Sequence, residues 1–373
     1  GKMDTGYTIT NTLTRVASFR VSKSATNEYG TADNNSTFTF QLTMTGKPVT
    51  DAQVKIGDDA AAAIGSNGTF QLKNGQTATI SNLPEDVTYT VTEIFSGSAG
   101  NAWTTKVGTK ETREASVANN SSVTFNNARI TRTITVNKTW VDGDEDGRPY
   151  ATFHLQKKVG DEWKNVATGE TRVGSVSFTV SKYDEDGTEI EYRVTEDDLP
   201  GYTVDKEPKP VDESNTVAFT NTRKMQVVVN KVWQTNGIAV KTNPTVKFQL
   251  YKGDQAVEGQ TKELTHGQTS VTFENLPYSE DYTVKEVSIE GGEVATLDEN
   301  GNAKNVDAED YFTLAADQAV GALTEQNGVL TGEVTFTNTA THRAVTVIKK
   351  VNLNGTEWTA NSYPTFNFKL EWK

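Results

Sequence analysis

Short runs of alternating apolar and polar residues recur along the whole chain. Runs such as 133–140 and 227–233 are rich in Thr and Val, and clusters of Gly, Asn, Asp and Pro separate them. A period of two predicts β-strands, because successive side chains of a strand point to opposite faces. No window keeps apolar residues at helical spacing with convincing caps, and the nearest candidate is the alanine-rich stretch 58–64. The pattern therefore predicts an almost all-β protein made of antiparallel sandwiches.

Three kinds of strand recur in an order that never changes. The first ends in lysine, the second begins with tyrosine and ends in glutamate, and the third ends in asparagine. The lysine strands are FRVSK ending at Lys23, ITVNK at Lys138, VVVNK at Lys231 and VTVIK at Lys349. The glutamate strands are YTVTE ending at Glu93, YRVTE at Glu196 and YTVKE at Glu286, and the asparagine strands are VTFNN ending at Asn127, VAFTN at Asn221 and VTFTN at Asn338.

The spacing of the lysines gives the size of the repeat. Successive lysines lie about 90 to 120 residues apart, much farther than in a solenoid, so each repeat is a whole domain. The predicted domains are 14–128, 129–223 and 224–340. Only a few residues separate the last strand of one domain from the first strand of the next. Links of this length favour a stiff, extended string of domains.

The two ends of the sequence match only parts of the repeat. Residues 7–12 read YTITNT, which is similar to an asparagine strand with Asn11 in the asparagine position. Residues 344–373 supply a lysine strand with Lys349 and a following FNFKL strand, but no glutamate or asparagine strand. We therefore expect 1–13 to close a preceding domain and 341–373 to begin a further one. Asn11 and Lys349 then have no partner within this sequence.

The alternation places the three recurrent polar residues on the inner face of their strands. Residues i, i+2 and i+4 of a strand share one face. In the second domain, Lys138 shares a face with Ile134, Val136 and Trp140. Glu196 shares a face with Tyr192 and Val194, and Asn221 shares one with Val217 and Phe219. The same register holds in the other two complete domains. Lysine and glutamate are rarely buried unless they are paired, so their burial in each domain requires a reason.

One reason is a covalent bond. Burial lowers the pKa of a lysine and raises that of a carboxyl group, so a buried pair can exchange a proton and become neutral. A neutral amine is a nucleophile, and it can attack the amide carbon of an asparagine while the protonated glutamate bonds to the amide oxygen and then moves the proton. Ammonia leaves and a new amide remains. The alternative is a buried hydrogen-bond network without any covalent bond.

These residues resemble the Cna B-type domains of Gram-positive surface proteins, which form spontaneous Lys–Asn isopeptide bonds. Besides the strand endings, the second domain carries VNKTWVDGDEDGRPY, SKYDEDGTEIEYRVTED and LPGY, which are similar to the lysine and glutamate segments of that family. The resemblance covers nearly the whole chain. It implies an all-β fold of tandem immunoglobulin-like (reverse Ig, Cna B-type) sandwich domains in an elongated array.

The resemblance also implies three crosslinks. They join Lys23 to Asn127, Lys138 to Asn221 and Lys231 to Asn338, with Glu93, Glu196 and Glu286 as proton shuttles that each act once. Two features depart from the pattern. The first domain has Ala25 where the others have Trp140 and Trp233, and the third has a long insertion over 287–332.

Composition removes several other classes of function. The chain has 36 basic and 49 acidic residues, a net charge of −13, which disfavours nucleic acid and anionic membranes as partners. It has no cysteine, no apolar run long enough to span a membrane and no basic-then-apolar leader at its start. No nucleophile elbow, Walker loop or dinucleotide fingerprint occurs. We expect neither an enzyme with turnover nor a bound cofactor.

Two acidic loops bear on metal binding. Asp142, Asp144, Asp146 and Gly147 match the first half of a calcium loop, but Phe153 stands where the bidentate glutamate is needed. The loop 298–302 lacks the required glycine. None of the three histidines, His154, His266 and His342, has a second one at metal-ligand spacing. We predict solvated acidic turns and no metal site.

The sequence leaves two hypotheses for function. The first is a structural stalk of a cell-wall-anchored adhesin, or the shaft of a pilus, on the outer surface of a Gram-positive bacterium, with neighbouring domains of the same array as partners. The second is an adhesive module that contacts a host matrix protein or glycan. Its best candidate surface is the insertion 287–332, because long loops on rigid scaffolds often carry recognition. The sequence does not name a ligand.

Overall fold

We describe the protein from a computed structural model. The structure describes residues 16–341 except 47, 50, 66, 86, 144, 145, 299, 301, 327 and 328, together with 349, 352, 353, 356, 357 and 368. Strands make up 63% of it and helices 3%, so the all-β prediction is confirmed. In the described residues no helix has the length and apolar character needed to cross a membrane. The stretch 58–64 contains the strand β4 (Ala62–Ala63) instead of a helix.

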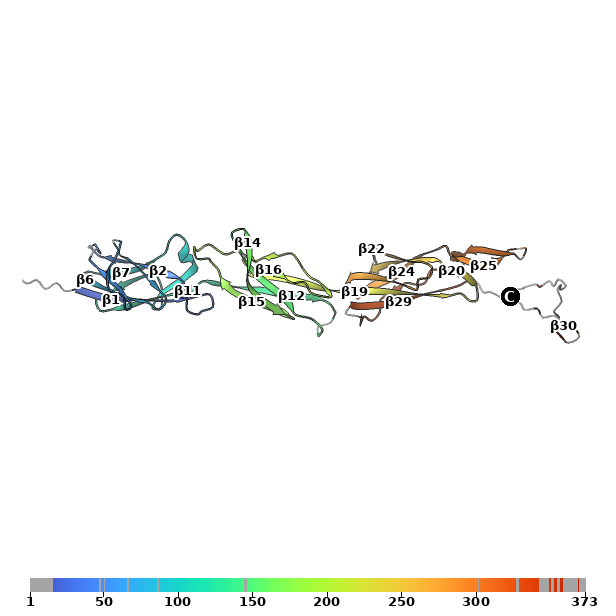
Figure 1. Cartoon of the computed structure of the whole chain (residues 1–373), viewed down its shortest axis with the longest axis horizontal. Coiled ribbons are helices and arrows are strands. Elements are labelled where there is room, and N and C mark those ends of the chain that lie inside the picture. The colour runs from blue at the N-terminus through green and yellow to red at the C-terminus, as the bar shows by residue number, and fades with distance from the viewer. Residues whose placement is uncertain are drawn as a thin grey trace, which may run out of the picture. The chain divides into compact units, whose positions relative to one another are not determined.

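The chain divides into two compact units, residues 1–222 and 223–373. Unit 1 contains two β-sandwiches, which we call the first and second sandwich, and unit 2 contains the third (Figure 1). Strand β19 (Thr216–Gln234) crosses the boundary. Its first part closes the second sandwich by pairing with β12, and its second part opens the third by pairing with β29.

The first sandwich packs a sheet in the order β4-β3-β6-β1-β11-β8-β9 against a sheet in the order β10-β7-β2-β5. Its further strands are β1 (Val16–Thr26), β2 (Thr37–Met44), β3 (Gln53–Ile56), β5 (Thr69–Lys73), β6 (Thr77–Pro84), β7 (Tyr89–Ile94), β8 (Trp103–Val107), β9 (Lys110–Glu111), β10 (Glu114–Val117) and β11 (Ser122–Arg129), with a 3-10 turn η1 (Ala99–Ala102) before β8. Alternate residues of β1 are buried, as the period of two predicts.

The second sandwich packs β15, β12 and the first part of β19 against a sheet in the order β14-β13-β16-β18. Its strands are β12 (Thr131–Val141), β13 (Ala151–Val159), β14 (Glu162–Thr171), β15 (Gly174–Ser181), β16 (Tyr192–Glu196), β17 (Tyr202–Thr203) and β18 (Lys209–Pro210). The buried core of this sandwich includes Ile134, Phe153 and Phe219.

The third sandwich packs β23, the second part of β19, β29 and β28 against a sheet in the order β22-β21-β24-β27. Its strands are β21 (Thr245–Lys252), β22 (Gln255–Leu264), β23 (Ser270–Pro277), β24 (Tyr282–Glu290), β27 (Gln318–Ala319), β28 (Thr324–Gln326) and β29 (Val329–Thr339). A short hairpin of β30 (Asn352–Leu353) and β31 (Thr356–Glu357) follows it in the chain.

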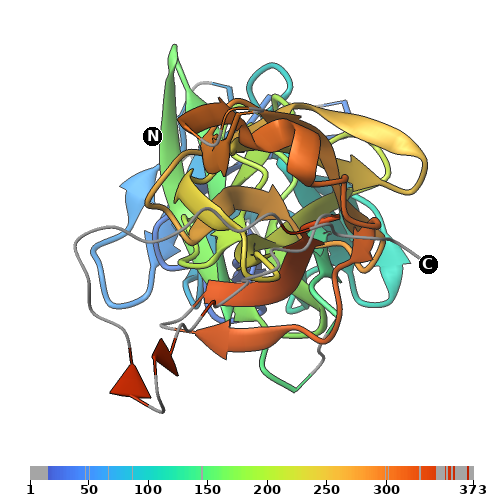
Figure 2. The same ribbon diagram turned by 90° about the vertical axis from the view of Figure 1, so that its right-hand side faces the viewer.

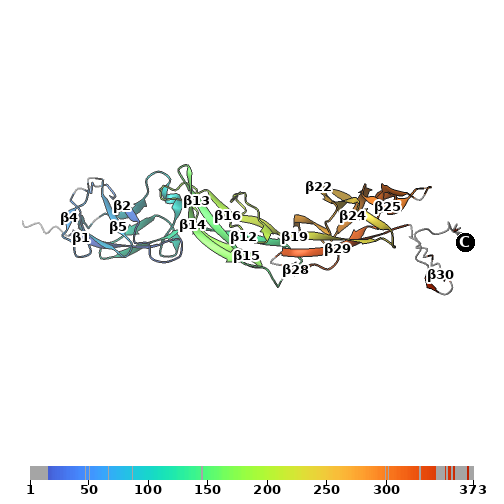
Figure 3. The same cartoon turned by 45° about the vertical axis from the view of Figure 1, so that its right-hand side comes forward.

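The insertion forms a small sheet of its own on the third sandwich. Strands β25 (Glu293–Leu297) and β26 (Ala303–Asp307) pair with each other, and β25 also pairs with β20 (Ala239–Thr242). A 3-10 turn, η2 (Ala308–Tyr311), follows β26. Labels β20 and β25 mark this part of unit 2 in Figure 1, and β25 marks it in Figure 3. In Figure 2 the insertion is coloured orange.

In every sandwich the lysine strand and the asparagine strand are parallel neighbours. Strand β1 pairs with β11, β12 with β19, and β19 with β29 (Figures 1 and 3). The register is the same each time, because the asparagine lies opposite the residue two positions after the lysine. The opposing pairs are Ala25 with Asn127, Trp140 with Asn221 and Trp233 with Asn338. Lysine and asparagine thus share the inner face of one sheet.

The glutamate comes from the opposite sheet. It lies on β7, β16 or β24, directly across from a buried phenylalanine: Phe40, Phe153 or Phe248. The tyrosine that begins each glutamate strand donates its hydroxyl proton to a backbone carbonyl at the end of an earlier strand, that of Pro84, Ser181 or Pro277. This bond fixes the start of the strand, so the glutamate four residues later is placed across the core from the lysine.

Candidate crosslinking sites

The structure brings the predicted lysine, glutamate and asparagine of each sandwich together in its core. Lys23, Lys138 and Lys231 have side chains with no exposed surface, and the side chains of Glu93, Glu196 and Glu286 are at most 1% exposed. The three asparagines, Asn127, Asn221 and Asn338, are buried as well. Each sandwich therefore holds an amine, a carboxyl group and a carboxamide away from water.

In the first site one carboxylate oxygen contacts both the amine and the amide. The Lys23 Nζ donates to Glu93 Oε1 at 2.7 Å, and the Asn127 Nδ2 donates to the same oxygen at 3.0 Å. Within the described residues, Glu93 Oε2 and Asn127 Oδ1 have no hydrogen-bond partner although both are buried. A single oxygen thus lies within proton-transfer distance of the amine nitrogen and of the amide nitrogen.

The second site has the same arrangement. Lys138 Nζ lies 3.0 Å from Glu196 Oε1, and Asn221 Nδ2 donates to that oxygen at 2.6 Å. Glu196 Oε2 and Asn221 Oδ1 are again buried without a partner among the described residues. The same geometry thus occurs in two sandwiches with different loops.

The third site is arranged differently. The Lys231 amine donates to Asn338 Oδ1, while its Nζ lies 3.9 Å from Glu286 Oε1. The Asn338 Nδ2 donates to Glu286 Oε2 at 2.9 Å. Here the amine is nearer to the amide than to the carboxylate, and the carboxylate holds the amide nitrogen.

Burial lowers the pKa of all three lysines. Desolvation is the largest cause, and it lowers the pKa of Lys23 and of Lys231 from 10.5 to about 8. The pKa of Lys138 is lowered for the same reason. The attraction of the neighbouring glutamate opposes the shift in each case but does not cancel it. The lowered pKa increases the fraction of neutral amine, which is the nucleophilic form.

Two aromatic rings cover each amine. The first ring lies within 5 Å of the lysine Nζ, and the second stands edge-on against the first. The pairs are Phe38 with Trp103, Trp140 with Tyr202, and Trp233 with Phe312; the Nζ-to-centroid distances are 3.9, 4.7 and 3.7 Å. In the first sandwich Phe38 of β2 takes the place that Ala25 leaves open. Sequence reasoning missed this substitution, because an inward phenylalanine on β2 has the same pattern as any other core residue.

The carboxyl group faces the amide nitrogen, whereas the sequence analysis expected it to face the amide oxygen. In the first two sites the glutamate accepts a hydrogen bond from the asparagine Nδ2, and Oδ1 has no partner within the described residues. This orientation places the carboxyl group beside the amide nitrogen.

Asn11 and most of the strand ending at Lys349 lie outside the described residues, and Lys349 itself is exposed.

Sequence comparison identifies the second and third sandwiches. Residues 134–222 and 227–306 match the Cna protein B-type domain. These two stretches are similar to Cna B-type domains. Residues 17–129 match a different family, a domain of unknown function named DUF7601, so the inclusion of the first sandwich among the Cna B-type domains stays a prediction. The second match ends within the insertion, before the asparagine strand of the third sandwich.

The curated relative that matches is a collagen adhesin of Staphylococcus aureus, 28% identical over 293 residues that cover 74% of this chain and 23% of the adhesin. The chain thus spans less than a quarter of that relative. Among solved structures, two B repeat units of the collagen binding protein of Staphylococcus aureus are 21% identical, with 87% of this chain and 75% of that chain covered and a TM-score of 0.26. The Bacillus anthracis TIE protein is 17% identical, with 87% and 50% covered and a TM-score of 0.32.

The calcium-like loop of the second sandwich has a structural role. The guanidinium of Arg148 donates to both carboxylate oxygens of Asp142, at 2.9 and 3.0 Å. The Tyr202 hydroxyl lies 3.5 Å from the same carboxylate. Asp144 lies outside the described residues. Across the described residues no cluster of three metal-binding side chains occurs.

The lowered pKa of Lys23 predicts a rise of stability with pH in a chain that cannot crosslink its first sandwich. Between about pH 8 and its ordinary pKa of 10.5, Lys23 is protonated in the unfolded chain and neutral in the folded one. Raising the pH over this range therefore favours folding, whereas below pH 8 both states hold the proton. In the Asn127→Ala variant we expect the urea midpoint of the first sandwich to rise from about pH 8 to about pH 10.

The matched control for this pH experiment is the double variant Lys23→Met, Asn127→Ala, which has no amine at the site. Its urea midpoint lacks the contribution of Lys23, so its pH slope gives the background from all other groups. Equal slopes in the two variants would contradict the prediction.

Proposed function

We propose that each lysine condenses with the asparagine of its own sandwich. The proton of the lysine ammonium passes to the glutamate, and the neutral Nζ attacks the asparagine Cγ. The Cγ–Nδ2 bond breaks, and the departing Nδ2 takes a proton from the carboxyl group and leaves as ammonia, while the proton lost by Nζ returns to the glutamate. The glutamate is left protonated, as it was just before the attack, and one amide has replaced another.

The observation that carries this proposal is the shared carboxylate oxygen in the first two sites. Glu93 Oε1 lies 2.7 Å from the Lys23 Nζ and 3.0 Å from the Asn127 Nδ2, so one atom can accept the proton from the amine and deliver it to the leaving nitrogen. A network that served stability alone would gain nothing from the buried, unpartnered Asn127 Oδ1, because an unsatisfied buried acceptor costs free energy. The lowered pKa of Lys23 supports the same chemistry.

The bond would join the first strand of a sandwich to its last strand. Since these strands are parallel neighbours, a pull on the two ends of the domain slides one along the other. A covalent bond between them carries that load without the hydrogen bonds of the sheet. We therefore propose a stalk or shaft segment of a surface adhesin or pilus, outside a Gram-positive cell and anchored to its wall, with the neighbouring domains of the array as partners.

A second candidate function is direct adhesion to a host matrix protein or glycan. The relative in Staphylococcus aureus is named a collagen adhesin, and this favours a matrix protein as the ligand. The insertion exposes two large apolar side chains, Leu297 at 67% and Leu314 at 52%. Loss of adhesion to a collagen-coated surface after Leu297→Ser would support this function. Unchanged adhesion would contradict it and favour the stalk function.

Mass spectrometry tests the crosslinks directly. We expect the intact chain to be lighter than its sequence by three ammonia molecules, and a protease digest to yield three branched peptides, each joining a lysine to its asparagine. Each of the variants Glu93→Gln, Glu196→Gln and Glu286→Gln should fail to form the crosslink of its own site only. The loss of mass then falls from three ammonia molecules to two. Glu162→Gln is the matched control, because its side chain is 78% exposed. An intact mass equal to that of the uncrosslinked sequence would refute the proposal.

A further inference from the structure

The part of the insertion that follows η2 returns over the third crosslinking site. After η2, Phe312 pairs with Ala340 just beyond β29, and the N–H of Thr341 donates to the Tyr311 carbonyl at 2.9 Å. The chain then runs through Thr313 and continues to β27, which pairs with the glutamate strand β24. This course fixes residues 312–315, which we call the covering segment, between the asparagine strand and the glutamate strand.

The covering segment contacts both polar groups of the site through its backbone. The N–H of Ala315 donates to Glu286 Oε2 at 2.5 Å, and the carbonyl of Thr313 accepts from the Asn338 Nδ2 at 2.7 Å. The Phe312 ring, 6% exposed, stands edge-on to Trp233 at 4.7 Å between centroids. The segment thus contacts the carboxyl group, the amide and the ring that lies over the amine.

These contacts account for the different geometry of the third site. In the first two sites, Glu93 Oε2 and Glu196 Oε2 have no partner among the described residues, and the other oxygen approaches the lysine to 2.7 and 3.0 Å. In the third, Glu286 Oε2 holds two donors and Oε1 is 3.9 Å from the amine. The Ala315 N–H thus holds the carboxylate and the Thr313 carbonyl holds the amide nitrogen, while the amide oxygen faces Lys231.

We propose that the covering segment is a positioning part of the third crosslinking site, and that its backbone groups hold Glu286 and Asn338 in place for the reaction. This inference rests on the proposed crosslinking. It gives this part of the insertion a role in forming the crosslink of its own domain. It also makes closure of the third bond depend on docking of the insertion, whereas the first two bonds depend on the strands alone.

Replacement of Ala315 by lactic acid during cell-free translation of the full chain tests the proposal. Lactic acid has the shape of alanine but puts an ester oxygen in place of the N–H, so it removes the donor to Glu286 alone. Samples taken over time, digested and weighed, give the rate at which each branched peptide forms. We expect the third bond to form about tenfold more slowly or worse, since small displacements of reacting groups cost large factors in rate, and the first two bonds to form unchanged.

Ala316 provides the matched control, because lactic acid there makes the same chemical change one residue later, where the side chain is exposed. Restoration of the alanine at 315 with the ester kept at 316 should restore the rate of the third bond. Equal rates for the third bond in the 315 ester and in the natural chain would overturn the inference, and so would equal slowing by both esters.

The fold of the third sandwich is followed in the same samples by hydrogen exchange of β24 and β29. Protection equal to that of the natural chain, with a slow third bond, supports a positioning role. Loss of protection in the 315 ester would overturn it, since the segment would then stabilise the fold and not the site. Absence of all three bonds from the natural chain would instead refute the proposed crosslinking itself.

Discussion

Lys138→Met is expected to turn the second sandwich from a domain that does not extend under load into one that unfolds. Methionine keeps most of the length and packing of the buried lysine side chain but has no amine, so the bond to Asn221 cannot form. A pull on the chain would then shear β12 against β19, and only hydrogen bonds would resist. Single-molecule force measurements on the full chain between marker domains should show one new unfolding step, on the order of 300 Å long for a domain of this size.

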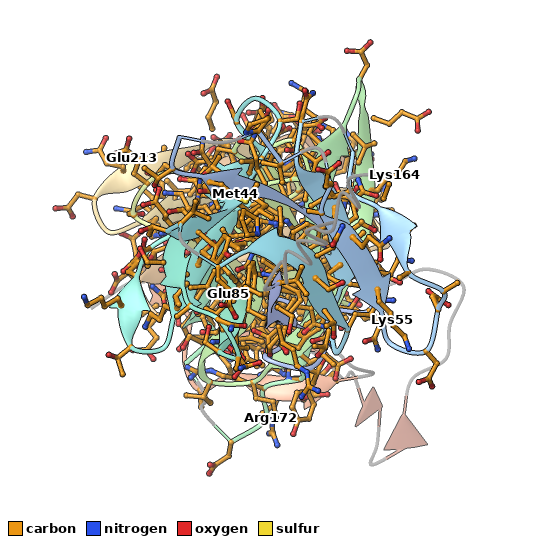
Figure 4. All side chains as sticks on the ribbon, turned by 90° about the vertical axis from the view of Figure 1, so that its left-hand side faces the viewer. Met44, Lys55, Glu85, Lys164, Arg172 and Glu213 are labelled. Carbon is orange, nitrogen blue, oxygen red and sulfur yellow. The ribbon has the colours of Figure 1, made fainter. Side chains whose placement is uncertain are left out.

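The same variant should also be less stable at equilibrium. A crosslink that closes a loop of this length contributes up to about 4.5 kcal/mol in the chain-entropy model. Lys164→Met is the matched control, because Lys164 projects outward at the edge of the molecule in Figure 4 and its side chain is 56% exposed. A force trace identical for the Lys138 variant and the control would contradict the load-bearing role of the second crosslink.

Arg148→Ala is expected to lower the free energy of unfolding of the second sandwich by about 3 kcal/mol, because it leaves a buried carboxylate without its partner. The Asp142 side chain is 1% exposed and that of Arg148 13%, so water screens this pair poorly. Hydrogen exchange of β12 and β16 measures the loss within this sandwich, without interference from the other two.

The double variant Asp142→Asn, Arg148→Met separates the unpaired charge from the lost packing. It removes both charges together, so we expect it to be clearly more stable than Arg148→Ala. If the two variants lose equal stability, the Arg148 side chain contributes packing alone, and the buried ion pair is not what holds this loop.

The sequence predicted that the lysine, glutamate and asparagine of each sandwich point inward, because a strand has only two faces. Once Val136 and Ile134 point inward, Lys138 must point inward as well, and the same holds for Glu196 and Asn221. The period of two does not say which strands pair or which sheet they join. The parallel pairing of β12 with β19 and the approach of Glu196 from the opposite sheet therefore came from the structure.

Contacts that depend on long loops were beyond sequence reasoning. The Ala315 N–H and the Thr313 carbonyl are ordinary backbone groups, so no side-chain pattern marks them as parts of a site. The ion pair of Asp142 with Arg148 lay within a recognisable motif, but the motif suggested an acidic turn, and nothing in the spacing showed that the arginine folds back onto the first aspartate. Phe38 replaces the missing tryptophan from another strand, which the repeat alone could not reveal.

Strand β19 carries Asn221 near its start and Lys231 near its end, so one strand serves two sandwiches. With the bonds in place, the second and third sandwiches are each spanned by a crosslink as well as by the backbone. Only the few residues between Asn221 and Lys231 are connected by the backbone alone. A protease that cut any loop of the second or third sandwich would nick the chain without dividing it. The molecule would then stay in one covalent piece after one cut in each of these sandwiches, whereas a single cut in the interval between them would sever it.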